Sequence, residues 1–232
     1  GLGDVYKRQS EDCVEFLENS KIQELLNKYC RFLPVAIAFG KKTEWKDGKQ
    51  VDTEEDNIVN DTNPLWNKHP NECTDEQYKD FYRKVFRDYK EPLFWIHLNM
   101  DYPFNLKGIL YFPKIRTEYD SIEGTIKLYN NQVFIADNIK EVIPEFLLLL
   151  KGVIDCPDLP LNVSRSALQN DGFVNKISEY ISKKVADKLS GMCKTKREDY
   201  EKYWDNISPF IKFGCLKDEK FCDKMKDTVL FK

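Results

Sequence analysis

Apolar residues recur at helical spacing in two stretches of the first part of the chain. From Asn19 or Ser20 to just before Pro34, this spacing predicts an amphipathic helix. A second helical period runs through TDEQYKDFYRKVF, with Thr74 as its N-cap and acidic residues in its first turn. Both patterns predict helices that bury one face.

Shorter apolar runs predict strands. They are VAIAFG, PLFWIHLNM, LKGILYFP and the two halves of GTIKLYNNQVFIAD. The pairs Asp47-Gly48 and Asn130-Asn131 suit tight hairpin turns, because these residue types tolerate a left-handed backbone. The acidic stretch DTEEDNIVNDTN holds too few apolar residues to bury, so it is predicted to be a mobile loop.

The last third of the chain reads as helices. Pro144 opens a predicted buried helix, PEFLLLLKGVI. A long helix is expected from Phe173 to Gly191, and another is expected to end before Pro209. Strands followed by helices predict an α/β fold, a helix-flanked mixed sheet in α-β-α layers followed by a helical extension.

Composition narrows the class of protein. The chain has 232 residues, 41% of them hydrophobic, which is enough for a substantial core. A net charge of -3 argues against a dedicated nucleic-acid binder, since phosphate binding needs a clustered basic surface. No apolar run is long enough to span a bilayer and no signal-peptide pattern is seen, so we expect no membrane partner and a cytoplasmic location.

The residues that usually bind metals are sparse. The seven cysteines are odd in number and scattered, and none forms a Cys-x-x-Cys pair, so free thiols are expected and no zinc site is predicted. His69 and His97, the two histidines, lie far apart in the sequence, and we expect each to be an ordinary surface or strand residue.

One arginine breaks a local rule. In CPDLPLNVSRSALQND the two prolines keep the approach extended and Asn162 or Ser164 can cap, which places Arg165 near the first position of a helix. A cation there opposes the helix dipole at a cost of up to about 1 kcal/mol. Two explanations stay open: an ion pair with Asp155 or Asp158, or an anionic ligand opposite the helix start.

The same stretch resembles a known motif. DLPLNVSRSALQ is similar to the motif loop in the middle domain of the heat-shock protein 90 chaperone family, in its bacterial form. Further segments resemble the family in the same order from about residue 11 to the end, among them NPLWNKHP, IKLYNNQVFI, IPEFLLLLKGVID and NISPFIKFG. Ser166 and Ala167 differ, since many members carry a longer pair there.

The resemblance implies a role in ATP hydrolysis. Arg165 would reach the terminal phosphate of ATP held by a separate nucleotide-binding domain, with Gln169 assisting and Asn162 and Ser164 supporting the loop. ATP and Mg²⁺ would be bound mainly by that other domain. No cofactor is expected in this chain, and no hydrolysis by the chain alone.

The resemblance also implies a domain plan. Residues 1–10 are expected to be a non-native or disordered leader, and residues 11–155 the large α/β subdomain of the middle domain. The motif loop, residues 156–172, would follow. Residues 173–232 would be connecting helices, cut short before a second, smaller subdomain.

Partners follow from the same resemblance. They are the nucleotide-binding domain of the same protein, non-native client proteins and co-chaperones, with dimerisation through a carboxy-terminal domain that this chain lacks, so the chain itself is expected to be a monomer. Trp66, beside prolines and an acidic stretch, is expected at the surface as a client contact. Trp95 is a second candidate, on the strand face that also carries His97 and opposite Phe94. The alternative is a stand-alone protein-interaction module with no ATP role.

Overall fold

The computed structural model describes residues 11–114, 125–140, 142–159 and 172–230. It contains two compact units. The hairpin unit comprises Gly1–Pro64 and Gln132–Phe134, and the sheet unit comprises Leu65–Asn131 and Ile135–Lys232.

The hairpin unit contains a short 3₁₀ helix η1 (Glu11–Leu17), helix α1 (Asn19–Tyr29) and strands β1 (Ala38–Lys46) and β2 (Lys49–Ile58). The two strands form an antiparallel ribbon. Its turn is the predicted one, because Asp47 and Gly48 have φ values of 52° and 73°, the left-handed backbone that a two-residue turn requires.

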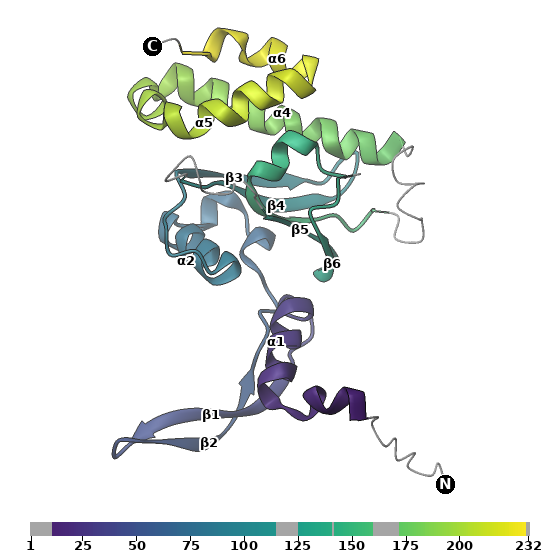
Figure 1. Ribbon diagram of the computed structural model, residues 1–232, viewed down its shortest axis with the longest axis vertical. Helices are drawn as coiled ribbons and strands as arrows, with labels where there is room; N and C mark the ends of the chain where they lie inside the picture. The colour runs from purple at the N-terminus through teal and green to yellow at the C-terminus, as the bar shows by residue number, and fades with distance from the viewer. Residues whose placement is uncertain (1–10, 115–124, 141, 160–171, 231–232) are drawn as a thin grey trace. The chain divides into compact units, whose positions relative to one another are not determined.

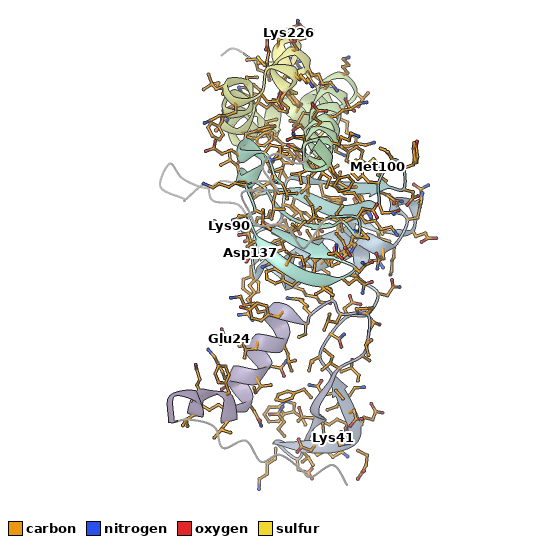
Figure 2. The ribbon with its side chains drawn as sticks, turned by 90° about the vertical axis from the view of Figure 1, so that its right-hand side faces the viewer. Glu24, Lys41, Lys90, Met100, Asp137 and Lys226 are labelled. Carbon is orange, nitrogen blue, oxygen red and sulfur yellow. The ribbon has the colours of Figure 1, made fainter. Side chains whose placement is uncertain are left out.

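The predicted mobile loop over residues 52–63 is wrong for most of its length, since β2 continues to Ile58. Burial does not order this strand, because nearly all of its side chains are exposed. Pairing with β1 does, aided by cross-strand ion pairs from Lys41 to Asp56 and from Lys42 to Glu55, each at 2.7 Å. Around Lys41 the side chains project away from the two strands (Figure 2).

The sheet unit begins with two 3₁₀ turns, η2 (Leu65–Asn67) and η3 (Pro70–Glu72), and helix α2 (Asp75–Phe86). The predicted N-cap of α2 is confirmed. The Thr74 hydroxyl accepts from the backbone N–H of Gln77, whose side chain accepts from the backbone N–H of Thr74, which satisfies two amide groups at once.

Five strands form the sheet in the order β3-β4-β7-β5-β6. Their bounds are β3 Phe94–Met100, β4 Leu106–Phe112, β5 Thr125–Asn130, β6 Val133–Asp137 and β7 Lys151–Asp155. Strand β7 is antiparallel to β4 and parallel to β5, so the sheet is mixed, as predicted.

Two features of this sheet differ from the sequence expectation. The residues with left-handed backbone between β5 and β6 are Asn131 and Gln132, so the predicted turn lies one residue later and Asn130 stays in the strand. The predicted helix from Pro144 is instead a 3₁₀ turn, η4 (Glu145–Leu149), followed by β7. A continuous apolar run suits a strand buried on both faces as well as it suits a buried helix, and β7 is such a strand.

Helices α4 (Gly172–Thr195), α5 (Arg197–Lys217) and α6 (Glu219–Met225), with the 3₁₀ turn η5 (Lys226–Thr228), complete the unit. Helix α5 runs through Pro209, where the sequence predicted an end. Proline removes one helical hydrogen bond, at a cost of about 3 kcal/mol. Burial of Ile207, Phe210 and Ile211 on either side of it offsets that cost.

The predicted α-β-α layers are confirmed. Figure 1 shows α4, α5 and α6 on one side of the sheet and α2 on the other. The helical side forms the main apolar core, to which the sheet contributes Phe94, Ile96, Leu98, Leu106, Leu110, Phe112, Ile126, Leu128 and Ile154. On the other side Tyr82 packs on Tyr111 at 4.9 Å between ring centroids, so α2 covers the second face.

Two helix glycines give a stability test. A Cβ atom at Gly214 would lie 2.6 Å from the Phe221 ring and 3.0 Å from the Phe146 ring, both buried, whereas at Gly191 it would meet nothing within 4 Å. Gly214→Ala is expected to lower the free energy of unfolding by about 2 kcal/mol through overpacking. Gly191→Ala, the matched control, should raise it by up to about 1 kcal/mol, because alanine favours helix. Chemical denaturation of both variants measures this, and equal stability would contradict the packing described.

Candidate functional site: the root of the motif loop

The motif loop leaves the sheet at the carboxyl ends of two parallel strands. Strands β5 and β7 are parallel, with Tyr129 opposite Asp155, so both end at one edge. The motif loop continues from Asp155, and helix α4 follows it in the chain. In open α/β sheets this edge is where ligand-binding loops are usually found.

Asn130, the last residue of β5, holds the start of the loop. Its side-chain amide donates to the carbonyl oxygens of Cys156, Pro157 and Leu159, at 3.1, 3.0 and 3.3 Å. Asn130 is only 8% exposed. Carbonyl groups of an irregular segment need partners when water is excluded, and one amide supplies them for three residues of this segment.

A second contact ties the loop to the β3–β4 connection. Asp158 Oδ2 accepts from the backbone N–H of Asn105 at 2.7 Å and from its side-chain amide at 3.2 Å. Asn105 directly precedes β4, whose first residues lie beside the end of β7. The loop therefore starts from a segment held from both neighbouring strands.

Trp66 braces the end of β7 from the α2 face. Its indole N–H donates to Asp155 Oδ2 at 3.2 Å, and its ring lies 5.3 Å from that of Tyr129 and 5.9 Å from that of Phe81. The expectation that Trp66 lies at the surface is wrong, because its side chain is fully buried. The polar residues around it are misleading, because η2 buries Trp66 together with Leu65, and a buried carboxylate satisfies the indole N–H group.

Trp95 is half-buried and stacks on Tyr78 of α2, with 5.0 Å between ring centroids and 25° between ring planes. The prediction that it shares a strand face with His97, opposite Phe94, is confirmed. That face is covered by α2.

His97 links three elements. Its Nε2–H donates to the Trp66 carbonyl oxygen at 3.4 Å, and its Nδ1 accepts from the Tyr78 hydroxyl at 2.7 Å, the tautomer that fits an acceptor-only carbonyl. Burial lowers the pKa of His97; the hydrogen bond to the Trp66 carbonyl oxygen opposes this in part, and the nearby charges of His69 and Lys107 lower the pKa further. Burial also raises the pKa of Tyr78. Both groups are therefore neutral in the folded chain near neutral pH.

Other chemistry is limited in the part of the chain that the structure describes. Cys30, Cys73, Cys156, Cys193, Cys215 and Cys222 are free thiols, and among the described side chains no cluster of three or more histidine, cysteine or acidic residues could hold a metal ion. Within the same ranges, no helix combines the length and apolar character needed to cross a bilayer.

Comparison with known proteins gives the family. The model of the Hsp90 protein family matches residues 40–232. The chain belongs to the Hsp90 family. It is 56% identical over 228 residues to the chaperone protein HtpG of Bacteroides fragilis strain 638R, covering 98% of this chain and 34% of that protein. It is 54% identical to HtpG of Porphyromonas gingivalis strain ATCC 33277, covering 98% of this chain and 33% of that protein.

A more distant relative agrees. HtpG of Dechloromonas aromatica is 35% identical over 231 residues, covering 98% of this chain and 36% of that protein. The chain thus spans about a third of the length of the relatives it matches.

The motif residues expected to act in this Hsp90 family member lie outside the described residues. They are Asn162, Ser164, Arg165 and Gln169. The structure describes the loop's root up to Leu159 and the start of α4 at Gly172. Sequence reasoning missed Asn130 as the anchor of this root. The available signal is an asparagine that directly follows the apolar strand IKLY, a position that is also typical of a turn residue.

Asn130 gives a direct test of the root. Asn130→Asp replaces the donor with a carboxylate facing three carbonyl oxygens, and should lower the free energy of unfolding by about 2 kcal/mol or more. Asn99→Asp makes the same chemical change at an exposed position of β3 and should leave stability nearly unchanged. Thermal unfolding of both variants measures the difference. If Asn130→Asp is as stable as Asn99→Asp, the amide does not anchor the loop.

His97 predicts a pH dependence. A histidine whose pKa is lowered by folding binds its proton more readily when unfolded, so its contribution is complete above the unfolded pKa of about 6.5 and is lost as pH falls through the folded pKa. Between about pH 7.5 and about pH 5, the wild-type chain should lose more stability than His97→Gln, which carries no titrating group there. Parallel stability curves for the two proteins would refute the assignment.

Proposed function

We propose that this chain is the segment of an ATP-dependent Hsp90-family chaperone that supplies an arginine to the terminal phosphate of ATP. The supporting observation is the position of DLPLNVSRSALQ, which follows directly from a rigidly held strand end in a chain of this family. ATP and Mg²⁺ would be held mainly by a nucleotide-binding domain elsewhere in the full-length protein.

Arg165 suits this role chemically. Phosphoryl transfer passes through a loose transition state that spreads negative charge over the equatorial oxygens. A guanidinium group is always protonated, planar and able to donate two parallel hydrogen bonds, so it stabilises that charge without transferring a proton. The predicted helix start would then contribute its dipole to the same anion, which explains a cation in an otherwise unfavourable position.

The neighbouring motif residues would assist. Gln169 follows Arg165 by four residues, which on a helix is about one turn, so both side chains can reach one ligand. Asn162 and Ser164 would hold the loop through local hydrogen bonds to its backbone.

A rigid root matters for such a residue. Transition-state stabilisation depends on donors that are already in position, and a misplacement of about 1 Å can cost about a hundredfold in rate. The anchors at Asn130, Asp158 and Trp66 fix the strand end from which the loop departs. This is the physical link between the described fold and the proposed activity.

The wider biology is proposed on family grounds. The full-length protein would assist the folding of non-native clients in the cytoplasm as part of the stress response, work with co-chaperones and form a homodimer through a domain outside this chain. That Trp95 contributes to a client surface stays a prediction. Trp66, being buried, offers no surface to a partner.

Steady-state ATP hydrolysis by the full-length protein tests the catalytic role. Arg165→Ala should lower kcat by about a hundredfold or more, with at most a small loss of nucleotide affinity and no change in thermal stability, because its contact with the terminal phosphate strengthens as charge develops in the transition state. Arg197→Ala, which removes an exposed arginine paired with Glu201 on α5, is the matched control and should hydrolyse ATP at the wild-type rate. An unchanged rate in Arg165→Ala would assign this arginine to a structural ion pair and remove the catalytic role.

A further inference from the structure

A cavity of about 570 Å³ lies within the sheet unit, away from the motif-loop root. Four segments line it: the start of β3, the start of α2, the last turns of α4 and the first turns of α5. Figure 1 shows α4 and α5 on the same face of the sheet. The volume is within the range of sites that bind small organic molecules.

The β3 wall of this cavity is aromatic and presents a strand edge. Leu93, Phe94 and Trp95 are consecutive and alternate between sheet faces, yet all three line the cavity, so the edge of the strand lies against it. In the described sheet β3 is the outermost strand, paired with β4 on one side. Trp95 is half-buried and held flat by its stacking on Tyr78.

The wall from α4 and α5 adds apolar surface. Met192 of α4 and Tyr203 of α5 both line the cavity. The Tyr203 ring packs against Phe94 at 6.0 Å between centroids, which fixes its orientation. Methionine adapts its shape to an apolar ligand, while the held aromatic rings offer flat faces.

Two lysines give the cavity a cationic end. Lys188 and Lys196 both line it, and neither forms an ion pair with any described residue. Lys188 keeps part of its surface in water, yet the atoms packed around its ammonium lower its pKa, and the charge of Lys196 lowers it further. An anion placed between the two ammonium groups would relieve their repulsion.

Three carboxylates limit the negative charge of a ligand that the cavity can accept. Asp75, Asp187 and Asp199 also line it, and Asp187 is paired with Lys224 at 3.2 Å. Since these acids would repel a ligand carrying several negative charges, the site favours one anionic group on an apolar body.

We propose that this cavity binds a small amphipathic organic anion. Its carboxylate or sulfonate lies between Lys188 and Lys196, and its aromatic or aliphatic body packs against Trp95, Met192 and Tyr203. The site requires neither the motif loop nor a nucleotide, so it stands apart from the proposed ATP role.

Two dyes that differ in charge test the assignment on the 232-residue chain. 8-Anilinonaphthalene-1-sulfonate carries the anionic group, and N-phenyl-1-naphthylamine has the same ring system without it. Fluorescence titration of the wild-type chain should show saturable binding of the sulfonate dye. The double variant Lys188→Gln/Lys196→Gln should weaken that binding about tenfold and leave the neutral dye unaffected.

Lys176→Gln is the matched control, because it removes an exposed charge from the same helix outside the cavity, and it should bind both dyes like the wild type. Lys188→Met with Lys196→Met repeats the test with apolar chains of similar length, and should also weaken only the sulfonate dye. The proposal is overturned if the sulfonate dye binds the double variants as tightly as the wild type. It is equally overturned if Lys176→Gln weakens binding as much, or if both dyes lose affinity together.

Discussion

Strand β7 is the element on which the rest of the sheet unit depends. It pairs with β4 on one side and β5 on the other, and its backbone approaches β4 so closely that a Cβ atom at Gly152 would lie 2.8 Å from the Ile109 carbonyl oxygen. Val153 and Ile154 point to opposite faces and are both fully buried. A strand held on two edges and two faces cannot shift without displacing both helical layers.

The fixed position of β7 also determines where the motif loop begins, at the end of the strand. Asp155 accepts from the Trp66 indole on the α2 face, and the next residues are held by the Asn130 amide and the Asn105 backbone. The motif loop therefore starts from one of the most fixed points in the unit. The proposed catalytic role of Arg165 depends on this fixed starting point.

Much of this architecture is readable from the sequence. Helical spacing located α1 and α2, the Thr74 cap was explicit, and the Asp47-Gly48 turn was assigned correctly, because each depends on local chemistry. The sequence predictions are wrong where contacts between residues far apart in the chain determine the secondary structure. Strand β2 is ordered by its pairing with β1 rather than by burial. The apolar run of β7 forms a strand because β4 and β5 flank it. Helix α5 continues through Pro209 because the residues on either side of the proline are buried in the core.

The residues of the candidate site likewise fall into those that the sequence predicts and those that only the fold brings together. The motif and its arginine were recognisable because they form one continuous stretch, whereas the anchors come from three distant segments. The sequence predicts Asn130 as a turn residue and Trp66 as a surface aromatic residue, because it does not reveal which distant groups either side chain contacts. The placement of Arg165 itself lies outside the described residues and stays a prediction.

The most direct test of a phosphate-contacting loop is amide hydrogen exchange in the full-length protein, followed in peptides covering residues 156–172 with ADP and with a non-hydrolysable ATP analogue. If Arg165 meets the terminal phosphate, exchange beyond Leu159 slows with the triphosphate analogue and not with ADP, while residues 156–159 stay protected in both states. Equal exchange of the loop with the two nucleotides would contradict the central claim.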